Sequence, residues 1–170
     1  MLTKLNPRAI IIAHWNSFRD DATGKLSWAE LIFHAVAPAA AAATYTVFGE
    51  GISENAAGIV VSAASIAAGL LLNLLVLIYT LVYNAKSARQ QIKNLDAMRQ
   101  VCDEALATIA YCILLSLLLV VAAFFAIAPR ASVLSAIGQP ATIYLGTANF
   151  LCVLIILKRV FALVHFEIQR

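Results

Sequence analysis

The sequence predicts an all-α membrane protein with four transmembrane helices, an N-terminal amphipathic helix and a cytoplasmic helical hairpin that extends the second and third spans. Of the 170 residues, 62% are hydrophobic and 12% are charged, whereas soluble domains carry about 25% charged residues. The charged residues also gather between long tracts that contain none. Both observations are typical of a chain that crosses a membrane several times.

Four segments meet the requirement of roughly 20 apolar residues for a spanning helix. They lie at about residues 31–48, 57–83, 105–128 and 141–157. Among the 12 Lys and Arg residues, only Arg130 lies in the two loops 49–56 and 129–140. Because positively charged residues are retained on the cytoplasmic side, we expect a multi-pass topology with both termini in the cytoplasm.

Residues 1–28, which precede the four-span domain 29–170, are predicted to form a cytoplasmic amphipathic helix and a capped turn. Ile11, Trp15 and Phe18 recur at helical spacing on one face. Such a helix can lie in the membrane interface or pack on the cytoplasmic end of the bundle. The sequence leaves both arrangements open.

The stretch RDDATGKLSWAE, residues 19–30, matches part of a calcium-binding EF-hand loop. However, Arg19 would occupy the first loop position, where the metal needs a carboxylate, and the sequence contains no second EF-hand. Ser27 and Glu30 instead fit a capping box at the start of the first span. We therefore expect a capped turn without calcium, and neither a metal site nor a cofactor.

The second and third spans are predicted to continue as helices into the cytoplasmic hairpin 84–104. No Gly or Pro interrupts residues 70–128, so a floppy loop is not expected there. A tight reversal near residues 94–96 would join the two helices, with Asp96 as the cap of the third. Each extension would rise about 12–15 Å above the membrane. The fourth span is predicted to continue into an amphipathic helical tail, 158–170.

The three cysteines do not predict a disulfide framework. Cys112 and Cys152 lie inside predicted spans, and Cys102 lies in the cytoplasmic segment. The expected role of all three is that of small buried apolar residues, and their spacing matches no metal site. His34 lies one turn from Glu30. That pair is either a proton-sensitive element or a partly hydrated structural pair, and we favour the structural role.

Catalytic motifs are absent from the sequence. It contains no P-loop, nucleophile elbow, HExxH motif or dinucleotide-binding glycine motif. The interiors of the predicted spans also contain no Asp or Glu. We therefore expect a protein that is not an enzyme.

Small and weakly polar residues form a stripe along one side of the second span, in steps of three and four residues: Gly58, Ser62, Ser65, Gly69 and Asn73. Shorter stripes occur in the third span (Thr108, Cys112, Ser116) and the fourth (Thr142, Gly146, Asn149). Such stripes either permit close helix packing or line a wettable, uncharged pore. In a homo-oligomer, Asn73 would form a ring around the axis.

The predicted cytoplasmic face is basic. Topology and anionic lipids account for most of its charge. A rigid hairpin in an oligomer would also repeat its basic residues as rings, which attract the phosphates of a nucleotide or oligonucleotide. The candidate residues for binding a signal or a partner are Arg8, Arg19, Lys25, Arg89, Lys93 and Arg99.

The layout resembles small four-span membrane proteins of bacterial antiphage defence operons, namely Hailong-type channel effectors and Kiwa-type membrane sensors. The resemblance covers the architecture of the whole chain, including the N-terminal stretch PRAIIIAHWNSFRDDATGKLSWAE, the short-looped spans and the basic hairpin. It implies a bacterial inner-membrane protein that oligomerises or opens in response to a cytoplasmic signal and depolarises the membrane.

The sequence thus predicts a homo-oligomeric gated ion channel, with a tetramer as the first guess. The stripe on the second span would line its path. One alternative is a non-conducting membrane anchor or sensor whose hairpin recruits a soluble partner protein. A small transporter or holin-like lesion former is another.

Overall fold

The computed structural model describes residues 8–16, 28–87, 95–129 and 132–168. Within these residues all regular secondary structure is helical, as the sequence predicts. The helices are α1 (Arg8–Asn16), α2 (Trp28–Phe48), α3 (Glu54–Ser87), α4 (Leu95–Ala126) and α5 (Val133–Ile168). The surroundings of side chains are described for residues 8–15, 32–80, 102–129 and 132–161.

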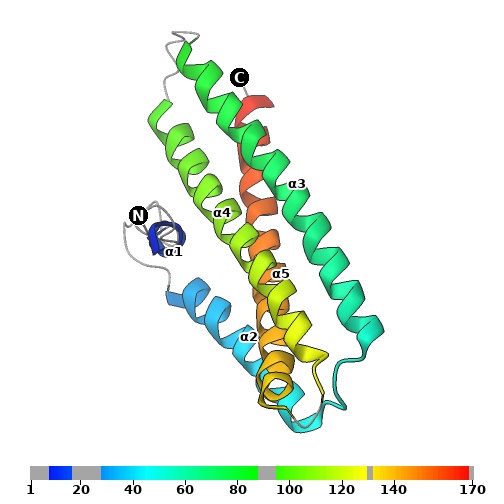
Figure 1. Cartoon of the computed structure of the whole chain (residues 1–170). Coiled ribbons are helices and arrows are strands. Elements are labelled where there is room, and N and C mark those ends of the chain that lie inside the picture. The colour runs from blue at the N-terminus through cyan, green and yellow to red at the C-terminus, as the bar shows by residue number, and fades with distance from the viewer. Residues whose placement is uncertain (1–7, 17–27, 88–94, 130–131, 169–170) are drawn as a thin grey trace.

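Three long helices form the body of the molecule. The helix α4 lies in the middle, with α3 and α5 packed along it, while α2 packs on α5 and α1 on α4 (Figure 1). Each long helix has an apolar stretch that is long enough to cross a membrane: Glu54–Thr80, Cys102–Ala126 and Val133–Phe161. By their length and apolar composition, these three stretches support the prediction that the chain is embedded in a membrane.

The first predicted span is the weakest of the four. Its helix, α2, has an apolar stretch of Ile32–Phe48, which falls slightly short of the roughly 20 residues that a spanning helix needs. Figure 1 shows α2 beside only the lower part of the bundle, and α1 lies above the N-terminal end of α2, well below the upper end of the bundle. The prediction of four spans is therefore supported for three helices, α3, α4 and α5. That α2 also spans the membrane stays a prediction.

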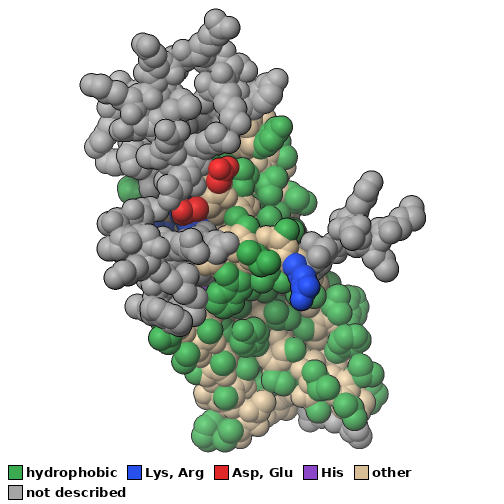
Figure 2. Space-filling view, turned by 90° about the vertical axis from the view of Figure 1, so that its left-hand side faces the viewer, with side chains coloured by type: hydrophobic (Ala, Val, Ile, Leu, Met, Phe, Trp, Pro, Cys, Tyr) green, Lys and Arg blue, Asp and Glu red, His purple; other side chains and the backbone are tan. Residues whose placement is uncertain are grey.

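The core lies along the seam between α4 and α5. Ile109, Cys112 and Cys152 are completely buried there, together with Ala105. Large apolar side chains such as Ile66, with 64% of its surface exposed, point outward instead. Figure 2 shows one face on which hydrophobic side chains cover the lower part of the molecule, and the coloured charged side chains lie at mid-height and above. This distribution fits a molecule that is surrounded by lipid over its lower part.

The helices continue beyond their apolar stretches. The helix α3 runs on from Thr80 to Ser87, and α5 runs on past Phe161 to Ile168. The helix α4 begins at Leu95, so Asp96 is its second residue rather than its cap. The predicted reversal between α3 and α4 falls mainly on residues 88–94, which lie outside the described part of the chain. At the opposite end, Gly51 has a φ of 100° in the turn that joins α2 to α3, a conformation that strongly favours glycine.

The buried side of the N-terminal helix is centred on His14 rather than on the predicted apolar stripe, of which Ile11 is partly buried. The most buried side chain of α1 is His14, with 1% of its surface exposed, whereas Trp15 is 38% exposed. Of the two predicted arrangements, the contact of α1 with α4 corresponds to packing on the bundle. Phe18 and the EF-hand-like stretch fall largely on residues 17–27, outside the described residues.

Candidate functional site

The stripe predicted on the second span lies on the outside of α3. All five of its residues are exposed, and together they are called the outer face of α3: Gly58, Ser62, Ser65, Gly69 and Asn73. The buried residues of α3 recur every seven positions on its other side, where the helix packs on α4: Ala57, Ala64, Leu71 and Ile78. Only 11% of the most apolar part of α3 is buried, against 44% for α4. Most of α3 therefore faces away from the rest of the chain.

The outer face of α3 is open to close approach. A Cβ atom added at Gly58 or Gly69 would meet no atom within 4 Å. The Ser65 hydroxyl donates a hydrogen bond of 2.8 Å to the carbonyl of Val61, which leaves it low in polarity. Among the described residues, the Asn73 amide finds no hydrogen-bond partner within the chain. This face thus combines small residues with one strongly polar side chain inside an apolar stretch.

The stripes on α4 and α5 are buried rather than exposed, because they face each other in the core. The Cys112 thiol donates to Asn149 Oδ1 at 2.8 Å, and Asn149 Nδ2 donates to Ser116 Oγ at 2.8 Å. All three side chains are buried. For these two stripes the helix-packing interpretation is confirmed: Asn149 cross-links two helices by hydrogen bonds.

An ion pair links α4 to α5 at one end of their apolar stretches. Arg159 Nη2 lies 3.4 Å from Glu104 Oε2, and the two side chains are 14% and 22% exposed, respectively. Arg159 Nη1 also donates to the Glu104 carbonyl at 2.7 Å and to the Thr108 hydroxyl. The guanidinium group is thus held by a carboxylate, a carbonyl and a hydroxyl of one helical turn, which fixes α5 against α4.

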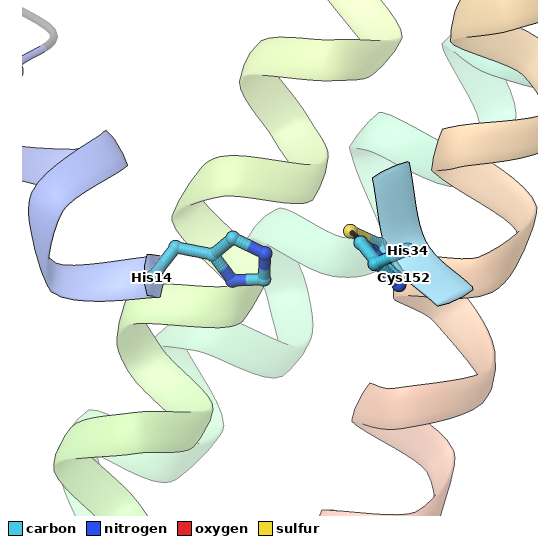
Figure 3. Close-up of side chains that lie close together, drawn as sticks. All are labelled: His14, His34 and Cys152. Carbon is cyan, nitrogen blue, oxygen red and sulfur yellow. Dashed lines mark hydrogen bonds between the residues drawn. The ribbon is translucent and has the colours of Figure 1, made fainter. Parts of the chain in front are cut away.

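Three metal-ligating side chains meet where α1, α2, α4 and α5 come together. They are His14 of α1, His34 of α2 and Cys152 of α5, and one donor atom of each lies within 4.8 Å of those of the other two. Cys152 Sγ is 3.3 Å from His34 Nε2. Figure 3 shows the His14 ring reaching from α1 across α4 toward His34 and Cys152. We call these three residues the His–His–Cys cluster.

The His14 ring is held by its neighbours. It stacks on the ring of Tyr111 of α4, with centroids 4.1 Å apart and planes 12° from parallel. The His34 ring lies 5.9 Å away on another side. Burial, together with the nearby His34 and Arg159, lowers the pKa of His14 to about 3. The imidazole is therefore neutral at physiological pH and offers a lone pair.

The candidate residues for signal binding fall mostly outside the described part of the chain. Arg8 is exposed at the start of α1. Arg19, Lys25, Arg89 and Lys93 lie outside the described residues, and Arg99 lies in α4 where side-chain surroundings are not described. The predicted pair of His34 with Glu30 is also untested, because the surroundings of the Glu30 side chain are not described. These assignments stay predictions.

Sequence reasoning missed both the His–His–Cys cluster and the Arg159–Glu104 pair. His34 and Cys152 are 118 positions apart, and Arg159 and Glu104 are 55 apart. Spacing rules for metal sites address ligands that are close in sequence, so they could not find the cluster, and no local pattern pairs two charges that are 55 positions apart. The usable signal for the cluster was a histidine among the apolar residues of α1.

Comparison with protein-family models, with curated proteins and with solved structures found no match to this chain.

Proposed function

We propose that this chain is a membrane-embedded protein that assembles with copies of itself through the outer face of α3 and forms an ion-permeable path along that face. One observation carries the proposal. The small and polar residues of α3 are exposed, while the similar stripes of α4 and α5 are buried against each other within the chain. A second copy can therefore reach only the stripe on α3.

A partner helix would stabilise the outer face of α3 by close packing and by hydrogen bonds. Small residues let two backbones approach closely, and polar side chains find hydrogen-bond partners that lipid tails do not offer. Placed around a symmetry axis, Asn73 and Ser62 of several copies would supply polar groups that an ion or water can contact. A tetramer is the first arrangement to consider.

We also propose that a cytoplasmic signal opens and closes this path. The helix α1 packs against α4, the direct neighbour of α3, so a cytoplasmic signal that moves α1 could be transmitted to the path through α4. A nucleotide or oligonucleotide is the signal that the basic residues favour. Membrane depolarisation under such control is the role that the resemblance to antiphage effectors implies.

Ion flux tests the proposal. Purified protein is reconstituted into liposomes, and the membrane potential of expressing bacteria is followed with a voltage-sensitive dye. Asn73→Leu is expected to reduce the flux several-fold, because apolar constrictions lose their water, while the oligomer persists. The matched control is Leu70→Ala, at an exposed position of α3 away from the stripe, which leaves the flux unchanged. Intact oligomers that pass no ions in liposomes, both without and with added nucleotides and oligonucleotides, would contradict conduction and favour the non-conducting anchor.

A further inference from the structure

We infer that His14, His34 and Cys152 form a binding site for a transition-metal ion of the zinc type, independently of the proposed ion path. The three residues are contributed by three helices, α1, α2 and α5. Together they present two imidazole nitrogens and one sulfur, all within a few ångströms of a common point. The sequence predicts no metal site here, so this inference departs from that expectation.

The distances suit tetrahedral coordination. With bonds of about 2.0–2.3 Å to nitrogen and sulfur, two ligand atoms of a tetrahedral zinc site lie roughly 3.3–3.8 Å apart. The separation of 3.3 Å between Cys152 Sγ and His34 Nε2 is already at this value. The longest separation in the cluster is at most 4.8 Å, so His14 must approach by about 1 Å. A small shift of α1, a short peripheral helix, provides that movement.

The donor set selects the class of metal. Imidazole and thiolate ligands suit zinc and neighbouring transition metals, whereas Mg²⁺ and Ca²⁺ require oxygen ligands. Three protein ligands leave the fourth position of a tetrahedron for water or another small ligand. On binding, the Cys152 thiol loses its proton to solvent and the sulfur lone pair forms the bond to the metal. Both imidazoles bind in their neutral form, and the thiol contributes one released proton per ion.

The electrostatic surroundings tolerate the ion. A divalent ion with one thiolate leaves a single positive charge in the site. Arg159, which acts on His14 electrostatically, is compensated by the Glu104 carboxylate at 3.4 Å. Because His14 and Cys152 are buried, competition from bulk water for the metal is weak.

Metal binding would fasten the N-terminal helix to the bundle. The helix α1 has nine residues, which is too short to be stable as an isolated helix in water. Its contact with α4 centres on His14, which stacks on Tyr111. A metal bond from His14 to the side chains of α2 and α5 would tie it to two further helices. The site would therefore act as a structural clamp on α1.

Cobalt absorption tests the site on the full chain purified in detergent. Co²⁺ added to metal-free protein is expected to bind one ion per chain and to produce d–d bands of tetrahedral cobalt and a thiolate-to-cobalt charge-transfer band. Zn²⁺ should then displace it. Cys152→Ser should abolish the charge-transfer band. The matched control is Cys102→Ser, because Cys102 is also a buried cysteine but lies outside the cluster, and this variant should keep the band.

A second variant separates loss of metal binding from loss of the folded structure. His14→Gln changes a residue of the peripheral helix α1 and should leave the helical circular dichroism of the bundle unchanged. It is expected to weaken Zn²⁺ binding by at least about 100-fold, the upper end of the losses that follow changes beside a metal ligand. Wild-type protein that binds no stoichiometric Co²⁺ or Zn²⁺, or binding that survives both substitutions, would overturn the inference. Neither outcome depends on whether the protein conducts ions.

Discussion

Replacing Arg159 by methionine is expected to lower the free energy of unfolding by about 2–4 kcal/mol. The substitution keeps much of the side chain's length but removes the Arg159 cation from beside the Glu104 carboxylate, in a place where that side chain is only 22% exposed. Breaking a fully buried pair from one side costs about 3–5 kcal/mol, and the residual exposure here reduces that cost. The Glu104 carbonyl and the Thr108 hydroxyl lose a donor as well.

Unfolding by a denaturing detergent, followed by circular dichroism, measures this effect. Lys158→Met is the matched control, because the neighbouring Lys158 is exposed and its replacement should change stability by about 0.5 kcal/mol or less. Adding Glu104→Gln to Arg159→Met should restore part of the loss, since it removes the uncompensated charge. A double variant that is as unstable as the sum of the two single variants would show that the pair is not coupled.

Replacing Gly138 by alanine is expected to destabilise the packing of α5 on α4 by about 2 kcal/mol. A Cβ atom at this buried position would lie 2.5 Å from the carbonyl carbon of Phe125 and 2.6 Å from the nitrogen of Ala126. Both are backbone atoms, which cannot rotate away as a side chain can. Overpacking of this kind costs about 3 kcal/mol at the upper end of its usual range, and the better helix propensity of alanine recovers about 1 kcal/mol.

Gly146→Ala is the control for this prediction. Its added Cβ would meet only Leu119 Cδ1, at 3.9 Å, which is an ordinary contact. The same gain in helix propensity should therefore leave this variant as stable as the wild type or more so. Equal stability of the two variants in the detergent unfolding experiment would contradict the close approach of α5 to the end of α4.

The positions of the long helices could be predicted because the signals that specify them are local. A run without Gly or Pro marks α4 and about half of α3, and the described part of this run is helical. The first predicted span was harder to judge from the same signals. The Ala-rich run of α2 is helical, yet its apolar stretch, Ile32–Phe48, is short. The length of this stretch, rather than its secondary structure, is why four spans stay a prediction.

The roles of the three polar stripes could not be read from the sequence. Asn149 of α5 and Asn73 of α3 occur in nearly identical patterns of small residues. Asn149 is buried and bonded to Ser116, whereas Asn73 is exposed. The difference depends on which helices pair, and pairing is a property of the whole bundle. Local periodicity identifies a stripe, but only the packing shows whether the chain itself covers it.

For the cysteines, too, the sequence predicts burial but not the neighbouring residues. Their predicted burial is confirmed for all three residues. However, the expectation that Cys152 serves only as a small apolar residue missed its neighbours, because His14 and His34 reach it from helices that are distant in sequence. Burial of a residue type can be predicted from its span, whereas the identity of its neighbours requires the tertiary fold.

The central claim, that copies of this chain meet through the outer face of α3, is tested most directly by disulfide cross-linking in membranes. Ser65→Cys places a thiol on that face, and Leu70→Cys places one on another exposed side of the same helix. The native cysteines are buried and should not link copies. Mild oxidation is predicted to produce covalent dimers from Ser65→Cys and few from Leu70→Cys. Monomers alone from Ser65→Cys, or equal cross-linking of both variants, would contradict the claim.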